Sequence, residues 1–237
     1  MENSAVKREA LGAGIFALTT PAHSFGADAV LLADFAAPRG EKHLCDLCAG
    51  CGIVSLLWSR DGAFAIDAVE LRPEATDLAR RAAEENGLEN VQVWEKDLRM
   101  LPSSWNGVYG LVACNPPYRA LGTGPASPSP AARDARSEAS CTLADAVGTG
   151  ARLLKNGGRL CFCHRPERLA ELLYRMHGAG VEPKRLRFAQ HKASSSPFLA
   201  LVEGKKGARP GLSVEAVLIL QEENGEPTPE FRRIYRM

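Results

Sequence analysis

The 237-residue sequence predicts an α/β domain with one open, mostly parallel sheet and antiparallel strands at its C-terminal edge. From about residue 43, short apolar runs alternate with amphipathic stretches, which is typical of parallel strands joined by helices. The last third of the chain is rich in strand-like runs instead. Hydrophobic residues make up 45% of the chain and the net charge is +1, which describes an ordinary globular domain.

The expected elements follow the chain in order. A helix over residues 28–37 packs beside the main fold. Parallel strands are then expected over 43–48, 65–71, 91–97, 109–115 and 157–164. Helices are expected over 53–60, 73–87, 143–155 and 165–180, and Pro73 and Gly87 mark the two ends of the second of these. Residues 119–138, rich in Pro, Gly, Ser and Ala, predict a mobile loop, and 184–191, 197–204 and 212–221 predict antiparallel edge strands.

The sequence carries no sign of a membrane or secreted protein. No apolar run approaches the roughly 18 residues that span a bilayer, and the first 14 residues lack the apolar stretch of a secretory signal. Seven cysteines, most of them inside apolar runs, favour buried reduced thiols over a disulfide framework. We therefore expect a cytoplasmic protein.

The segment "DLCAGCG" (46–52) joins the first parallel strand to the first helix after it. Gly50 and Gly52 permit a sharp turn and a close approach of a ligand to the backbone. Glu70 lies at the end of the next strand, where a carboxylate can hold the ribose hydroxyls of an adenosine-containing cofactor. Asp97 ends the third strand, within reach of the adenine. A tight turn with no ligand is the simpler interpretation of the glycines alone.

The glycine spacing argues against a nicotinamide cofactor. The G-x-G-x-x-G pattern has Ser55 at its third position here, and Asp46 before the turn would oppose a pyrophosphate. An acidic residue at that position suits a cofactor with a positive amino group and a sulfonium, which is S-adenosylmethionine.

Cys45, Cys48 and Cys51 form a C-x-x-C-x-x-C run that raises the possibility of a metal site. Cys45 lies inside the predicted strand, so its side chain and that of Cys48 should point to opposite faces. No second Cys/His cluster stands at ligand spacing, and we expect no metal. Cys161 and Cys163 share one face of a strand and are expected in the core.

The segment "NPPY" (Asn115, Pro116, Pro117 and Tyr118) follows the fourth parallel strand, at the same sheet edge as the glycine turn. The side-chain oxygen of Asn115 and the carbonyl of Pro116 can accept the two N–H bonds of a planar exocyclic amine. The prolines hold these acceptors rigid, and Tyr118 offers a face on which a base can stack. A strand end with a core tyrosine is the simpler alternative.

These residues resemble the motifs of class I S-adenosylmethionine-dependent amino-methyltransferases, in "DLCAGCG", "VEL", "KDL" and "NPPY". Nearly the whole chain is similar to the bacterial tRNA1(Val) adenine-N6-methyltransferases, which modify the adenine just 3′ of the anticodon. The additional matches are "FGADAVLLADF" (25–35), "HRPERL" (164–169), "EPKRLRF" (182–188) and "LVEGKKGARPGLSVE" (201–215).

The resemblance implies a Rossmann-like class I methyltransferase fold, with residues 1–40 packing over the cofactor site and residues 41–237 forming the methyltransferase domain. It implies that the methionine end of S-adenosylmethionine contacts Asp46, Cys48, Ala49, Gly50 and Gly52. Glu70 and Leu71 would hold the ribose, Asp97 and Leu98 the adenine, and residues 115–118 the target base. Phe25 and Asp28 would lie over the cofactor. The family usually carries glycine where Cys48 stands.

A tRNA substrate requires phosphate contacts, and residues 164–192 hold seven Lys or Arg against three Glu. We expect the phosphate contacts to come from Lys184, Arg185, Arg187, Lys192, Lys205 and Lys206. We expect a monomer or a homodimer.

Two alternatives stay open at this point. NPPY also serves methylation of release-factor glutamine and of DNA adenine, although only about 40 residues precede the first parallel strand and no target-recognition insertion is visible. An inactive RNA-binding module is the alternative outside enzymes, and the intact Asp46, Glu70 and Asn115 argue against it.

Overall fold

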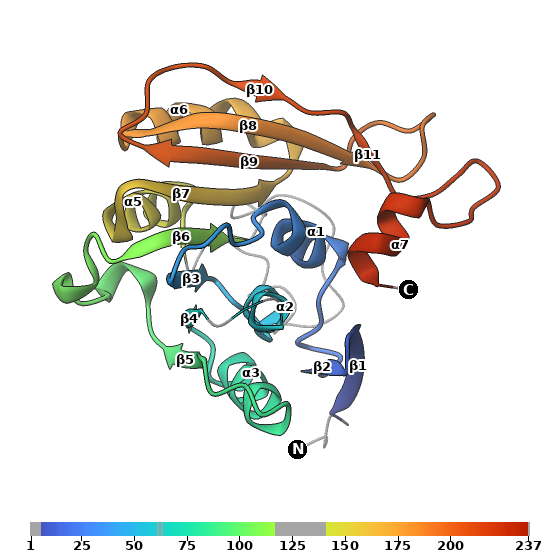
Figure 1. Cartoon of the computed structure of the whole chain (residues 1–237), viewed down its shortest axis with the longest axis horizontal. Helices are drawn as coiled ribbons and strands as arrows, with labels where there is room; N and C mark the ends of the chain where they lie inside the picture. The colour runs from blue at the N-terminus through green and yellow to red at the C-terminus, as the bar shows by residue number, and fades with distance from the viewer. Residues whose placement is uncertain (1–5, 61, 63, 117–140, 237) are drawn as a thin grey trace.

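The computed structural model of the chain describes residues 6–60, 62, 64–116 and 141–236 (Figure 1). Pro117, Tyr118 and the predicted loop over 119–138 therefore lie outside the described residues.

The main sheet has nine strands among the described residues, in the order β10-β8-β9-β7-β6-β3-β4-β5, with β11 also paired to β8. Strands β7, β6, β3, β4 and β5 are mutually parallel, and β9 runs antiparallel to both β7 and β8. The strands are β3 (His43–Leu47), β4 (Ala65–Glu70), β5 (Val91–Glu95), β6 (Tyr109–Cys114), β7 (Leu154–His164), β8 (Val181–Gln190), β9 (Leu199–Lys206), β10 (Ser213–Val214) and β11 (Leu218–Ile219). The α/β class and the antiparallel pairing of β7, β9 and β8 confirm the prediction.

Helices cover both faces of this sheet (Figure 1). Helices α1 (Ala27–Phe35), α2 (Ile53–Ser59) and α3 (Pro73–Glu85) pack on one face, and α5 (Leu143–Leu153) and α6 (Leu169–Gly178) on the other. The short helices η1 (Leu98–Met100), η2 (Ser103–Trp105) and η3 (Pro166–Arg168) complete the connections. All of these helices are too short to cross a bilayer, and the described part of the chain contains no membrane-spanning candidate.

Local sequence signals start and stop the helices. Pro73 occupies the first turn of α3, where its missing N–H costs no hydrogen bond, and Gly87 beyond the helix has φ +68°. Helix α5 begins with a capping box, in which Thr142 and Asp145 each accept a backbone N–H of the other. These signals fix where each helix leaves the sheet.

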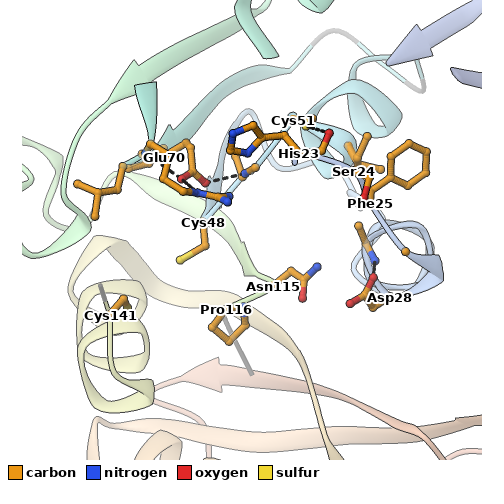
Figure 2. A pocket seen from close by; sticks show the side chains of 18 of the residues that line it. His23, Ser24, Phe25, Asp28, Cys48, Cys51, Glu70, Asn115, Pro116 and Cys141 are labelled. Carbon is orange, nitrogen blue, oxygen red and sulfur yellow. Dashed lines mark hydrogen bonds and ion pairs between the residues drawn. The ribbon is translucent and has the colours of Figure 1, made fainter. Parts of the chain in front are cut away.

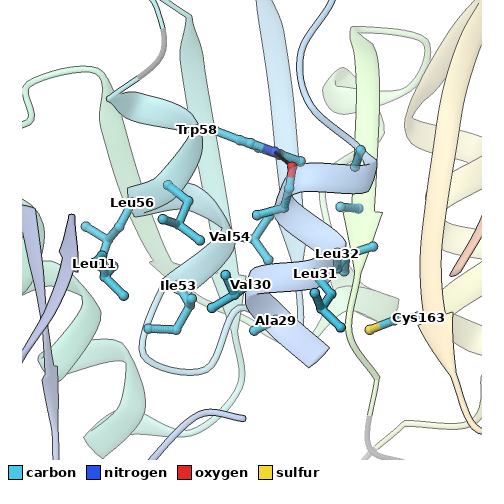
Figure 3. Close-up of a cluster of buried hydrophobic side chains, with 14 of the residues drawn as sticks. Leu11, Ala29, Val30, Leu31, Leu32, Ile53, Val54, Leu56, Trp58 and Cys163 are labelled. Carbon is cyan, nitrogen blue, oxygen red and sulfur yellow. Dashed lines mark hydrogen bonds between the residues drawn. The ribbon is translucent and has the colours of Figure 1, made fainter. Parts of the chain in front are cut away.

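The core on the α1–α3 side contains Trp58, whose side chain is almost completely buried (Figure 3). Its indole N–H donates to the carbonyl of Ala33 at 3.2 Å, so the bulky ring is buried without an unsatisfied donor. Cys161 and Cys163 both lie in this core, as predicted, whereas Phe162 between them faces the α5–α6 side.

Two elements were not predicted. Residues 7–19 form a hairpin of β1 (Lys7–Gly12) and β2 (Ile15–Thr19), and helix α7 (Pro229–Tyr235) packs near α1 at the end of the chain. One expectation about the edge was also wrong: β10 and β11 each pair with β8 in parallel, not antiparallel. The chain reverses after β9, so these two-residue segments run in the same direction as β8.

Candidate functional site

A cavity of about 530 Å³ opens where the carboxyl ends of β3, β4 and β6 meet, within the size range of small-ligand sites. The segment before α1, the turn after β3 and the ends of β4, β5 and β6 supply most of its wall (Figure 2). The cavity is lined by residues 21–29, 48–51, 53, 69–72, 96–98, 115, 116, 141, 165, 191, 198 and 199.

The turn after β3 is built from left-handed backbone conformations. Cys48 and Gly50 each have φ +56°, and Gly52 has φ +79° as the residue before α2. An L side chain is disfavoured in this region, so the glycines suit it and Cys48 is strained. The left-handed Cys48 also breaks the strand alternation, and its side chain packs on the same side of the sheet as Cys45. The expectation that these two cysteines point to opposite faces was therefore wrong.

Asp46 lies beneath this turn and is not among the cavity-lining residues. Its Oδ2 accepts hydrogen bonds from the backbone N–H (3.1 Å) and the hydroxyl (2.8 Å) of Ser55 in the first turn of α2. Burial raises the pKa of this carboxyl group to about 7. Asp46 thus ties β3 to the first turn of α2, the two elements that the glycine turn connects.

Glu70 ends β4 and holds the glycine turn from the opposite side. Its Oε2 accepts the backbone N–H of Gly50 at 2.8 Å, and its Oε1 accepts the backbone N–H and Nε–H of Arg72 at 3.0 and 2.9 Å. A carboxylate has about four acceptor positions, so one further donor fits without rearrangement. To accept two ribose hydroxyls, Glu70 needs the Arg72 side chain to move aside.

Asp97 and Leu98 follow β5 and line the cavity together with Lys96. The guanidinium of Arg99 donates to both oxygens of Asp97, and this contact lowers the pKa of the carboxyl group below its usual value. Asp97 is therefore a carboxylate at neutral pH, and the side chain of Leu98 is buried beside it.

The segment before α1 and the first turn of α1 close one side of the cavity, with Phe25 in the former and Asp28 in the latter (Figure 2). The Cys51 thiol donates to the carbonyl of His23 at 3.4 Å, which attaches this segment to the glycine turn. Burial lowers the pKa of His23, so its imidazole is neutral at pH 7. Phe25 and Asp28 thus line the same cavity as the glycine turn, and their place over a cofactor stays a prediction.

Asn115 and Pro116 come directly after β6 and line the same cavity (Figure 2). Asn115 Oδ1 accepts the thiol proton of Cys163 at 3.1 Å, from the neighbouring strand β7. The structure therefore brings together eleven of the predicted cofactor and base-binding residues around one cavity. These are Phe25, Asp28, Cys48, Ala49, Gly50, Glu70, Leu71, Asp97, Leu98, Asn115 and Pro116.

Several cavity residues were not predicted. Arg72 and Lys96 adjoin predicted residues, whereas Arg165, His191 and Phe198 come from loops that β7, β8 and β9 carry to the cavity. His191 and Phe198 stack with ring centroids 4.4 Å apart and an interplanar angle of 15°. No local motif identifies them, since they reach the cavity only through the strand order.

Most of the predicted phosphate-binding residues make contacts within the protein. Arg185 donates to Glu203 and Glu215, and Arg187 makes a two-fold ion pair with Glu230. Three of the lysines donate from their ammonium groups to backbone carbonyls. Lys184 donates to Arg209, Lys192 to Glu223, and Lys206 to Ala151 and Leu154. The phosphate contacts stay a prediction, and Arg185, next to the buried Glu203, is used structurally.

The cysteines in the described ranges are free thiols. Within those same ranges, no cluster of His, Cys, Asp or Glu side chains could hold a metal ion.

Comparison with known proteins agrees with this geometry. Residues 14–127 match the family model of the methyltransferase small domain. A tRNA1(Val) (adenine(37)-N6)-methyltransferase from Tolumonas auensis is 28% identical over 213 residues, which is 87% of this chain and 85% of that protein. A protein of the same name from Klebsiella pneumoniae is 36% identical over 104 residues, 41% of each chain.

Solved structures share the fold. A predicted O-methyltransferase from Agrobacterium tumefaciens has a TM-score of 0.72 at 22% identity, and covers 88% of this chain and 95% of its own. The Pyrococcus horikoshii TYW2 in complex with MeSAdo has a TM-score of 0.61 at 15% identity, and covers 88% of this chain and 74% of its own. Residues 14–127 therefore resemble the methyltransferase small domain, the chain has the fold of the solved class I methyltransferases, and its sequence is similar to those of the bacterial tRNA1(Val) (adenine(37)-N6)-methyltransferases.

Proposed function

We propose that this chain transfers a methyl group from S-adenosylmethionine to the exocyclic N6 amine of an adenine in tRNA, next to the anticodon of tRNA1(Val). The observation that carries the proposal is the meeting of Asn115 and Pro116 with Glu70 and the glycine turn around one cavity. An amine clamp and an adenosine-binding edge in the same space are what methyl transfer to a base amine requires.

The cofactor half of the cavity suits S-adenosylmethionine. Glu70 Oε2 retains an acceptor position for a ribose hydroxyl, and the buried Leu98 offers an apolar surface for the adenine. Asp46 Oδ1 is buried and receives no hydrogen bond from the described residues, so a cationic group above the turn would stabilise its ionised form.

The reaction asks little of the protein beyond orientation. When bound, S-adenosylmethionine supplies an electrophilic methyl group on a positive sulfur. Asn115 Oδ1 and the carbonyl of Pro116 accept the N–H bonds of the target amine, which draws its lone pair out of conjugation with the ring. Both acceptors are fixed at the end of a buried strand, so few groups have to move during the reaction.

The substrate half of the cavity suits a nucleotide from RNA. Arg165 brings positive charge to the cavity, and the stacked His191 and Phe198 offer an aromatic surface to a base. Because tRNA is the proposed substrate, the site of action would be the cytoplasm.

The test uses purified protein, labelled S-adenosylmethionine and two unmodified tRNA1(Val) transcripts, one carrying adenine at position 37 and one carrying guanine there. Label in N6-methyladenosine from the first transcript alone, and none with the Asn115→Ala variant, is the expected result. Label in neither transcript, with tight binding of S-adenosylhomocysteine, would overturn the tRNA assignment. A release-factor protein and a DNA duplex, assayed in parallel, would then identify a glutamine or a DNA adenine as the acceptor.

A further inference from the structure

We propose that Cys163 is a positioning residue for the methyl transfer, because its thiol orients the carboxamide of Asn115. The inference rests on the proposed function. It concerns a residue outside the segment that contains the amine clamp, in the middle of the sheet.

The contact joins two neighbouring parallel strands at the edge that forms the cavity. Cys114 pairs with Phe162 in the register of β6 and β7, so Asn115 and Cys163 are the next residues along each strand. The Cys163 Sγ lies 3.1 Å from Asn115 Oδ1, a short distance for a hydrogen bond that involves sulfur. Cys163 is completely buried, and Asn115 is partly exposed to the cavity.

Orientation matters because the two ends of a carboxamide have the same shape and opposite chemistry. The oxygen accepts hydrogen bonds and the nitrogen donates them, so a rotation of 180° about the last side-chain bond would present N–H groups to the target amine. In the structure the thiol donates to the oxygen. This bond favours the orientation in which Oδ1, with its second lone pair, serves as an acceptor.

The location of Cys163 makes the constraint rigid. Its side chain belongs to the core between the sheet and α1, with Leu31 and Leu32 among the members of the same cluster. A buried side chain on a central strand has few rotamers available, so the donor is held in place before any substrate arrives. The chain thus uses a core residue to set the direction of a catalytic acceptor.

The strand also offers a matched control. Cys161 lies two residues earlier, has the same complete burial and belongs to the same core cluster. Its thiol donates to the carboxylate of Glu203 instead, with 3.8 Å between Sγ and Oε2. Removing either sulfur should lower the unfolding temperature similarly, and only Cys163 should change the chemistry.

The experiment compares Cys163→Ala, Cys163→Ser and Cys161→Ala with the wild type in single-turnover tRNA methylation. We expect Cys163→Ala to lower the rate of methyl transfer about fivefold, as the loss of one hydrogen bond predicts, with cofactor affinity unchanged. Cys163→Ser, which keeps a donor, should recover most of that rate, and Cys161→Ala should leave it unchanged. Equal losses in the two alanine variants, or no rescue by serine, would overturn the proposal.

A second measurement separates this inference from the proposed function. The side-chain amide signals of Asn115, assigned by their loss in Asn115→Asp, are recorded by NMR without substrate. A shift or broadening in Cys163→Ala and not in Cys161→Ala supports the orienting bond even if tRNA is not the substrate. Identical Asn115 signals in wild type and Cys163→Ala would exclude it.

Discussion

Glu70 accepts the backbone N–H of Gly50 at 2.8 Å across twenty residues of sequence, and so joins the end of β4 to the glycine turn after β3. The same carboxylate binds Arg72 through its other oxygen. One side chain thus shapes the backbone of the turn and carries the negative charge at the cavity wall.

We predict that Glu70→Gln weakens cofactor binding at least about tenfold. A glutamine has only one acceptor oxygen, so its amide nitrogen would face either the Gly50 N–H or the Arg72 guanidinium as an unmatched donor. Titration calorimetry with S-adenosylhomocysteine measures the affinity. Glu84→Gln, on the exposed side of α3, is the control and should bind as the wild type does. Equal affinities for Glu70→Gln and the control would remove Glu70 from the cofactor site.

Asp46 predicts a pH dependence of cofactor binding. Burial raises the pKa of its carboxyl group to about 7, so the folded state favours the neutral form. The free energy of unfolding therefore falls as the pH rises from about 4 to 7. A cationic ligand above the turn favours the ionised form, so S-adenosylhomocysteine with its amino group should bind more tightly at pH 8 than at pH 6. Asp46→Asn should flatten this profile. A profile that keeps its slope in the variant would assign the dependence to another group.

At Gly52 we predict that an added side chain destabilises the fold by a steric contact. Gly52 has φ +79°, and an added Cβ would lie 3.1 Å from the Cβ of Ala79 on α3. Gly52→Ala should therefore lower the free energy of unfolding by more than Gly87→Ala, which has φ +68° and nothing within 4 Å of its added Cβ. Denaturation in urea measures both. Ala79→Gly should cost less stability in the Gly52→Ala background than in the wild type, because it relieves the contact there. An equal cost in both backgrounds would show that backbone strain alone is responsible.

At position 48 we predict that the glycine variant is more stable than the alanine variant, the reverse of their usual order in a helix. Both substitutions remove the thiol, but only glycine adopts φ +56° without strain. Cys48→Gly should be more stable than Cys48→Ala by about 1 kcal/mol in urea unfolding. At Ala83, inside α3, glycine should instead be the less stable residue. If alanine is favoured at both sites, the turn does not hold residue 48 in the left-handed conformation.

The sequence pattern predicted the parallel strands because each is a short apolar run that ends at a polar or glycine residue, as in 43–48 and 109–115. It predicted which residues would meet around one cavity because parallel strands bring their carboxyl ends to one edge, and the roles of these residues in binding stay predictions. The β1–β2 hairpin was missed since "KREALGAGIFALT" has little polar–apolar alternation, and α7 since it is only seven residues long. Arg165, His191 and Phe198 could not be found, because the loops next to β7, β8 and β9 meet at the cavity only through strand pairings distant in sequence.

The position of β9 between β7 and β8 affects the order in which the newly made chain can assemble. Residues 181–190 leave the ribosome before residues 199–206, yet they have no strand of the main sheet to join until the later segment has emerged. The edge formed by β3, β4 and β6 can order during translation, whereas β7 keeps an open side until β9 has been made. A nascent chain that stopped before residue 199 would expose the unpaired backbone groups of that strand, and such an open edge recruits strands of other chains.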